Sequence, residues 1–383
     1  MKFAHMADLH IGSWRDPKLR NASTVAFEKA IDECVLEKVD FILFSGDLFN
    51  TTLPGIDNLK RVVKKLKSLV EFKIPVYVVP GSHDYSPSGK TMIDVLEEAG
   101  LLINVFKGSI SGKKLSLKFI KDDSGALITG IIGKKGMLDQ EYYDNLEVVN
   151  EEGFKIFLFH TAVKELLPKS LDMIKSISVN DFPAGFDYYA GGHIHTVKIY
   201  DNFVYPGPLF PNSFSEVEKF GKGGFFIYDN GNMKRKDIEL YPHRGLVLDC
   251  SGLTPEDIYL KIEEWNPNFN NALVTLRLTG VINGRVIDIP FKKIFDKIYS
   301  SGAYFIMRNT NKLSSENLEN LETEETSIEE IEKEVFKDYE NKELALKLMD
   351  SLSGEKNEGE RVYEYEDRIK KDVMTILNLL RKN

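Results

Sequence analysis

The chain has 383 residues, of which 42% are hydrophobic and 28% are charged, values typical of a soluble globular protein. Its length exceeds that of an ordinary single domain, so we expect two or three domains. No stretch approaches the about 18 apolar residues that a membrane span needs, and the N-terminus has no basic segment followed by a long apolar one. The two cysteines, Cys34 and Cys250, lie far apart in sequence and exclude a disulfide framework or a cysteine-ligated zinc site. We therefore expect a cytoplasmic, intracellular protein with no membrane segment.

The net charge of -9 resides in the C-terminal part of the sequence. From Ser314 onward there are 20 acidic and 11 basic residues, which leaves 39 of each sign for residues 1–313. Because the body is neutral as a whole, the acidic total does not exclude a basic face, and it is such a face that binds a polyanion.

The first half of the sequence alternates short β-rich runs with helical patterns. Helices are predicted from about Ser23 to Lys38 and over residues 56–72. Strands are predicted at Phe3–Ala7, Phe41–Phe44, Val76–Val79, Ala126–Ile132, Phe154–Phe159, Tyr188–Gly191 and Gly224–Tyr228. This order predicts an α/β layer, and we assign residues 1–243 to one sheet-centred domain.

After residue 243 the pattern restarts. Residues 244–310 alternate three strand patterns with two helical ones and predict a small α+β domain. Residues 311–325 contain mostly Asn, Ser, Thr and Glu, which predicts an acidic linker. Residues 326–383 show two helical patterns with apolar stripes. Their apolar positions include Ile328, Val335, Phe336, Leu348, Val373, Ile376, Leu377 and Leu380.

Polar motifs stand at the ends of five predicted strands. They are Asp8-Leu9-His10, Gly46-Asp47, Gly81-Ser82-His83-Asp84, His160 and Gly192-His193-Ile194-His195. A period of two puts Asp8 and His10 on the same side of the chain, within reach of one ion. Since ligands collect at the carboxyl ends of strands in α/β sheets, the five ends are expected to converge.

Each of these motifs alone is more often a turn or a pair of strand residues than a metal site. Their joint occurrence, each after an apolar strand, favours a metal site. We interpret the two remaining histidines, His5 inside the first strand and His243 at a domain junction, as structural residues.

The five motifs, in this order, resemble those of the calcineurin-like metallophosphoesterases. Within that superfamily, Ala7–Gly12 and Ser45–Phe49 are most similar to the Mre-eleven/SbcD DNA-repair nucleases of archaeal type. The resemblance implies an α/β fold with a two-layered β-sandwich core flanked by helices. It also implies a small α+β capping domain and a helical C-terminal tail, although the tail is similar in layout only.

The resemblance implies two Mn²⁺ ions per chain. Asp8, His10, Asp47 and His195 would hold one ion, and Asp47, Ser82, His160 and His193 the other. Two such ions clamp a phosphodiester and activate a water. The imidazole ligands argue against Mg²⁺ and Ca²⁺ and are compatible with Mn²⁺, Fe²⁺ or Zn²⁺.

The third motif, Gly81-Ser82-His83-Asp84, contains the candidate general acid and one residue that differs from the motif of the family. His83 would be the general acid, oriented and charged by the adjacent Asp84. Ser82 stands where relatives carry Asn, and because its hydroxyl is shorter than an amide, we expect the second ion to bind more weakly.

Several residues are candidates for contact with DNA. Arg15, Lys18 and Arg20 follow the first metal motif in a predicted loop, and Asn50 stands where some relatives place a histidine that turns the phosphate. Lys234–Lys236 form a second basic cluster. Each cluster alone is more often solvated surface, but a neighbouring phosphoesterase site favours phosphate contacts.

Two protein partners are predicted. By resemblance, residues 56–72 with Met92, Ile93 and Val95 would form a homodimer. The tail helices would bind a Rad-fifty/SbcC-type coiled-coil ATPase, since isolated helices with apolar stripes need a partner; packing back on the body is the alternative.

The predicted function is that of a manganese-dependent DNA nuclease subunit of a double-strand-break repair complex that acts on DNA ends. The resemblance implies 3'-5' exonuclease and single-strand endonuclease activity and a nucleoid-associated location. Two alternatives stay open. One is a small-molecule or phosphoprotein phosphoesterase, because fold and metals do not set the substrate. The other is a DNA-bridging scaffold with catalysis weakened by Ser82.

Overall fold

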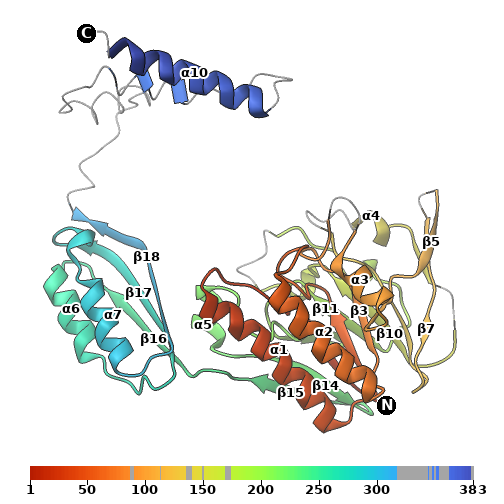
Figure 1. Ribbon diagram of the computed structural model, residues 1–383. Helices are drawn as coiled ribbons and strands as arrows, with labels where there is room; N and C mark the ends of the chain where they lie inside the picture. The colour runs from red at the N-terminus through yellow and green to blue at the C-terminus, as the bar shows by residue number, and fades with distance from the viewer. Residues whose placement is uncertain are drawn as a thin grey trace. The chain divides into compact units, whose positions relative to one another are not determined.

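The computed structural model describes residues 1–86, 90–112, 114–134, 140–148, 151–168, 174–316, 344, 347–348, 351–352 and 362–380. The chain divides into two compact units, Met1–Ser315 and Glu316–Asn383. Figure 1 shows the first unit as stacked sheets and helices and labels the elements used below.

The first sheet of Met1–Ser315 contains the N-terminal strands. Its order, among the described strands, is β15 (Asn232–Ile238), β14 (Gly223–Asp229), β1 (Lys2–Met6), β2 (Phe41–Ser45), β3 (Val76–Val79) and β4 (Ile103–Asn104). Strands β1 to β4 are parallel and β14 is antiparallel to β1. The central strands β2 and β3 are mostly apolar and buried along their whole length, because both faces of the sheet are covered.

A second sheet packs on the first. Its order within the described residues is β12 (Lys198–Tyr200), β13 (Phe203–Tyr205), β11 (Tyr188–Gly192), β10 (Lys155–His160), β8 (Leu127–Gly130) and β7 (Ile120–Lys121). Side chains of both sheets share one apolar core, in which Phe3 and Phe41 meet Leu158 and Tyr188. The predicted two-layered β-sandwich is therefore confirmed.

Helices cover the outer face of the first sheet. They are α1 (Pro17–Glu37), α2 (Ile56–Glu71) and α3 (Met92–Glu98), and their apolar residues pack on Ala4, Met6 and Phe44. Helix α1 begins at Pro17 with Asp16 as its N-cap, six residues before the predicted start. Ile93, which we expected at a dimer surface, is fully buried in this core, whereas Ile56 and Val95 are 82% and 58% exposed.

Smaller elements complete the first 242 residues. Strands β5 (Gly108–Ser111), β6 (Lys114–Leu117) and β9 (Leu146–Val148) form a separate small sheet, and helices α4 (Gln140–Tyr143) and α5 (Phe214–Phe220) lie in connections. The second sheet's outer face is covered by an aromatic cluster that includes Phe157, Phe159 and Phe182.

Residues from His243 to Ser315 form a small three-stranded parallel sheet with two helices, here called the cap. The strands are β16 (His243–Asp249), β17 (Leu273–Ile282) and β18 (Phe305–Ser315), and the helices are α6 (Pro255–Glu264) and α7 (Phe291–Ser300). The predicted linker start at 311 is wrong, because β18 pairs with β17 as far as Ser315. The polar side chains of this stretch belong to a half-exposed strand and resemble a linker in composition alone.

In the second unit, the described part of the tail includes helix α10 (Val362–Leu380). Met374 and Leu377 on this helix are 51% and 40% exposed, whereas Val373 and Ile376 of its apolar stripe are half-buried. The candidate partner residues Ile328, Val335 and Phe336 lie outside the described residues. In the part of the chain that the structure describes, no helix is both long and apolar enough to cross a bilayer.

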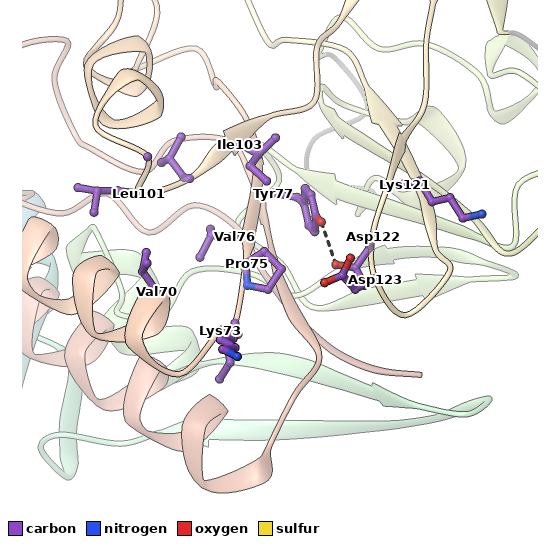
Figure 2. A pocket seen from close by; sticks show the side chains of 13 residues that line it. Val70, Lys73, Pro75, Val76, Tyr77, Leu101, Ile103, Lys121, Asp122 and Asp123 are labelled. Atoms are coloured by element: carbon purple, nitrogen blue, oxygen red, sulfur yellow. Dashed lines mark hydrogen bonds between the residues drawn. The ribbon is translucent and has the colours of Figure 1, made fainter.

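A cavity opens at the start of β3. It has a volume of about 300 Å³, is lined by Val76, Leu101 and Asp122 among others, and contains a 2.8 Å hydrogen bond from the Tyr77 hydroxyl to Asp122 (Figure 2). It lies at the amino end of β3, whereas the motif residues 81–84 follow the carboxyl end. This cavity is therefore separate from the motif residues.

Candidate active site

The five strand-end motifs converge at one rim. The parallel strands β1, β2 and β3 of one sheet and β10 and β11 of the other end there. Three groups of side chains bring ligand atoms within 4.8 Å of one another: Asp8, His10 and His195; Asp8, Asp47 and His160; and His10, Asp47 and His83. The convergence that the sequence predicts is thus present.

The first group is built around Asp8. Its Oδ1 lies 3.8 Å from His195 Nε2, and the Nε2 atoms of His10 and His195 are 3.0 Å apart. Burial lowers the pKa of His10 from 6.5 to about 3, so this ring is neutral. Burial opposes the charged form of His195 as well, but Asp8 and Glu216 outweigh it and raise its pKa to about 9.

The second group is built around Asp47. Its Oδ2 lies 3.1 Å from Nε2 of His160 and 3.6 Å from Nε2 of His10. The Nδ1–H of His160 donates to the Ser45 carbonyl at 2.8 Å, which turns Nε2 toward Asp47. Burial acts to raise the pKa of Asp47, yet His160 and then His10 lower it below its usual range. One carboxylate thus faces ligands of both groups.

Four of the ligand candidates have unusual backbone conformations. Asp8, His10, Asp47 and His193 have positive φ angles of 52°, 42°, 52° and 95°. Such conformations are costly for residues other than Gly and persist where surrounding structure enforces them, commonly at functional sites. Here they turn the chain sharply at each strand end and keep the side chains on the rim.

Glycines next to the ligands leave space for them. A Cβ at Gly81 would collide with the Oδ1 and the backbone nitrogen of Asp47, and a Cβ at Gly46 would collide with the His160 ring. The glycines of the Gly-Asp and Gly-x-His-Asp motifs are therefore required to leave space for the neighbouring ligands, as well as to form turns.

The structure corrects the role of Asp84. Its buried carboxylate accepts hydrogen bonds of 3.0–3.1 Å from the backbone N–H groups of Leu48, Phe49 and Gly81. It therefore fixes the loop after β2 and does not orient His83. The His83 ring is held instead at Nδ1, 2.9 Å from the carbonyl oxygen of Asn50. Adjacency in sequence was misleading because Asp84 points into the protein.

His193 and Ser82 are less closely placed. The backbone N–H of His193 donates to Asp8 at 2.8 Å, and its ring centroid lies 5.2 Å from that of His160. Burial lowers the pKa of His193 to about 4, which keeps the ring neutral. Ser82 is buried, with 9% of its surface exposed. The roles of both as ligands stay predictions.

Three of the candidate DNA contacts line one cavity beside the rim. Arg15, Arg20 and Asn50 border a space of about 620 Å³. Lys18 lies elsewhere, with its ammonium group 5.7 Å from the ring centres of Tyr299 and Tyr304 on the cap. The predicted loop is wrong for Lys18 and Arg20, which lie in the first turn of α1.

The second basic cluster is largely neutralised by local partners. Arg235 contacts Asp237 at 3.0 Å, and Lys236 is paired with Glu37. These contacts favour the structural interpretation for Arg235 and Lys236.

Other histidines behave as structural residues. His5 is buried, with hydrogen bonds to the Tyr188 hydroxyl and to Ser45 Oγ, and His243 bonds Thr275. Neither belongs to the three ligand groups among the described residues.

The residues at the rim fit divalent metal ions. Within the described part of the chain, Asp8 Oδ2 and His10 Nδ1 are buried without a hydrogen-bond partner. A buried carboxylate oxygen without a partner is costly, and a cation would relieve that cost. The mixture of carboxylate and imidazole donors suits Mn²⁺, Fe²⁺ or Zn²⁺.

This geometry agrees with comparisons to known proteins. Residues 1–197 match the calcineurin-like phosphoesterase family. The match covers half of the chain and includes every candidate metal ligand, and the chain belongs to this family. Family membership gives a phosphoesterase fold and the expectation of divalent metal binding, as the rim also indicates.

The chain is also similar to archaeal DNA repair proteins. The chain is 29% identical over 377 residues to the DNA double-strand break repair protein Mre11 of Methanococcus maripaludis, covering 92% of this chain and 94% of that protein. It is 30% identical over 238 residues to the Archaeoglobus fulgidus protein of the same name, covering 57% and 52%. The Methanocaldococcus jannaschii protein of that name is 26% identical over 393 residues, covering 95% and 98%. The predicted resemblance is therefore confirmed.

Proposed function

We propose that the protein is a divalent-metal-dependent DNA nuclease subunit of a double-strand-break repair complex, with manganese as its metal. The observation that carries this proposal is the convergence of Asp8, His10, Asp47, His160 and His195 at one rim. The end-to-end similarity to proteins named for DNA double-strand break repair supports the choice of substrate.

The residues at the rim would bind the metal ions and hold them in place for catalysis. Bound divalent ions would supply Lewis acidity and an activated water for attack on phosphorus. Asp8, His10, Asp47 and His195 would hold one ion, and Asp47, Ser82, His160 and His193 the other. The glycines at 46 and 81 and the hydrogen bond from His160 to Ser45 keep these ligands aimed at the rim.

His83 is the proposed general acid. Its Nδ1–H donates to the Asn50 carbonyl, so the proton that is exchanged with substrate is at Nε2. Its backbone N–H donates to Asp47 Oδ1 at 2.7 Å, which fixes the residue to the central carboxylate. This location lets Nε2 deliver a proton to the leaving oxygen.

DNA is the proposed substrate because cations border the rim. Arg15 and Arg20 line the 620 Å³ cavity and would contact phosphates outside the cleaved bond. The 3'-5' exonuclease and single-strand endonuclease activities are part of the same proposal. A small-molecule or phosphoprotein phosphoesterase would use the same ligands and is the alternative.

We also propose an assembly. Residues 1–243 would be the nuclease domain, followed by the cap and a tail that binds a coiled-coil ATPase. The exposed side chains of Ile56 and Val95 support a homodimer surface near α2 and α3. Light scattering at micromolar concentration and ATPase binding by the chain lacking residues 326–383 test these two contacts. A monomer mass, or undiminished ATPase binding, would contradict them.

The substrate assignment is tested by competition. Wild-type protein with Mn²⁺ is given duplex DNA ends, bis-p-nitrophenyl phosphate and p-nitrophenyl phosphate, with Asp47→Asn as the inactive control. The proposal predicts cleavage of DNA and the diester and suppression of diester cleavage by DNA. Preference for the monoester supports the alternative, and DNA binding without cleavage supports the scaffold interpretation.

A further inference from the structure

Glu216 supports the candidate ligand His195 from behind. Its Oε1 lies 2.9 Å from Nδ1 of His195, and its Oε2 accepts a 2.8 Å hydrogen bond from the backbone N–H of Asn212. Both carboxylate oxygens are engaged, so the carboxylate cannot rotate without losing a partner. The His195 ring is thereby held with Nε2 toward Asp8 and His10.

This contact has a clear chemical consequence. A histidine that binds a metal through Nε2 must carry its proton on Nδ1, and a carboxylate that accepts that proton fixes both the tautomer and the ring orientation. Glu216 is not one of the residues that the motifs identify. It is placed by helix α5, whose N-cap Ser213 accepts from the N–H of Glu216 at 3.2 Å.

The same helix is attached to the cap. The guanidinium of Arg277 on β17 donates hydrogen bonds to the carboxylate of Glu218. Its Nε lies 2.9 and 3.0 Å from the two carboxylate oxygens, and its Nη2 lies 2.6 Å from Oε2. The Arg277 Cζ also lies 5.0 Å from the ring centre of Phe214. Residues two apart on a helix point to different sides, so Glu216 faces the rim while Glu218 faces the cap.

A second attachment joins the start of α5 to the first metal motif. The Ser13 hydroxyl donates to Asn212 Oδ1 at 2.9 Å, and the Ser13 N–H donates to the His10 carbonyl at 2.9 Å. The segment that carries Glu216 is therefore fixed to the loop of His10 at one end and to the cap at the other.

We propose that Glu216 is a positioning residue for His195 and that α5 links the metal site to the cap through the ion pair of Glu218 and Arg277. The link rests on the proposed function, since it assumes that His195 binds metal. Loss of the ion pair would remove the contact that holds α5 on the cap. Because the carboxylate of Glu216 would then be less firmly positioned against His195, the affinity for metal would fall.

The test measures binding of Mn²⁺ alone to the full chain by electron paramagnetic resonance titration, without DNA. Glu216→Ala raises the Kd of at least one Mn²⁺ by about 10- to 100-fold. Glu216→Gln keeps an acceptor for His195 and gives a smaller loss, which distinguishes positioning from folding. Arg277→Met raises the Kd by about 2- to 30-fold.

Glu28→Gln is the matched control. It removes a similarly exposed bidentate ion pair, between Glu28 and Arg61 on α1 and α2, away from the rim. Its Mn²⁺ affinity equals that of the wild type if the effect is specific. Thermal unfolding of each metal-free variant identifies any that fails to fold, in which case Glu216→Gln and Arg277→Met decide.

The possible results separate this link from the proposed function. If the wild type binds no Mn²⁺, the proposed function fails. If the wild type binds Mn²⁺ and Glu216→Ala binds it equally well, the positioning role is wrong while the proposed function stands. If Arg277→Met matches Glu28→Gln, the link to the cap is wrong.

Discussion

Nε2 of His160 lies 3.1 Å from Oδ2 of Asp47, although His160 ends a strand of one sheet and Asp47 follows a strand of the other. The contact therefore spans the sandwich at its rim. A ligand pair of this kind depends on the packing of one sheet against the other, so the site is a property of the whole fold.

Removal of the proposed general acid should depend on the leaving group. We expect His83→Gln to slow DNA cleavage by about 10²–10⁴-fold. Bis-p-nitrophenyl phosphate should be much less affected, because its leaving group needs little protonation. Steady-state rates on both substrates check this, with Mn²⁺ affinity as the control for site integrity. Equal losses on both substrates would contradict an acid role.

A methyl group at position 81 should displace the central carboxylate. Gly81→Ala brings a Cβ against Asp47, so we expect Mn²⁺ affinity to fall by about 10-fold or more, as when a ligand loses its support. Gly55→Ala is the matched control, since a Cβ there meets no atom within 4 Å. Isothermal titration measures both, and equal affinities in the two variants would show that Asp47 tolerates the displacement.

Replacement of Ser82 by the residue of relatives should strengthen the second ion site. The amide of Ser82→Asn reaches farther than the hydroxyl, so Mn²⁺ affinity and diester cleavage should both rise, by about 10-fold if one ligand is gained. Stoichiometry from titration with Mn²⁺ and the rate of diester cleavage report the change. Unchanged affinity and rate would mean that Ser82 does not weaken the site.

Burial of His5 should make the fold sensitive to acid. Burial lowers its pKa from 6.5 to about 3 in the folded state. Between these values the unfolded chain binds a proton that the folded chain does not, so the free energy of unfolding falls as pH falls, by up to about 1.4 kcal/mol per pH unit. Urea unfolding of the metal-free protein at pH 7.5, 6.5 and 5.5 measures this dependence.

His5→Gln should flatten that dependence while lowering stability at pH 7.5, where its hydrogen bonds to Tyr188 and Ser45 are lost. The other buried histidines titrate in both proteins, so the difference between the two curves isolates His5. Parallel curves would show that its protonation does not affect folding.

Much of the fold and site could be predicted from the sequence, because buried parallel strands and the motifs after them have recognisable local sequence patterns. The apolar run Val76–Val79, for example, is soon followed by Gly81-Ser82-His83-Asp84, and it forms a buried strand with that motif at the rim. The alternation of Phe3 and Ala4 between two cores also follows from the period of two.

Other features depend on tertiary contacts that no local sequence pattern indicates. Asp84 is adjacent to His83 in sequence, yet backbone N–H groups from the loop after β2 hold its carboxylate away from that ring. Glu216 stands three residues after Ser213, a spacing typical of a helix start. The spacing of Ser213 and Glu216 therefore indicates helix capping and gives no sign of the contact between Glu216 and His195.

The most direct test of the central claim is anomalous scattering from a crystal of the protein soaked in Mn²⁺. The account predicts two peaks at the rim, one reached by Asp8, His10 and His195 and the other by His160, with Asp47 in contact with both. Strong peaks only elsewhere, for example at Asp122 and Asp123 in the cavity beside β3, or none at all, would contradict it.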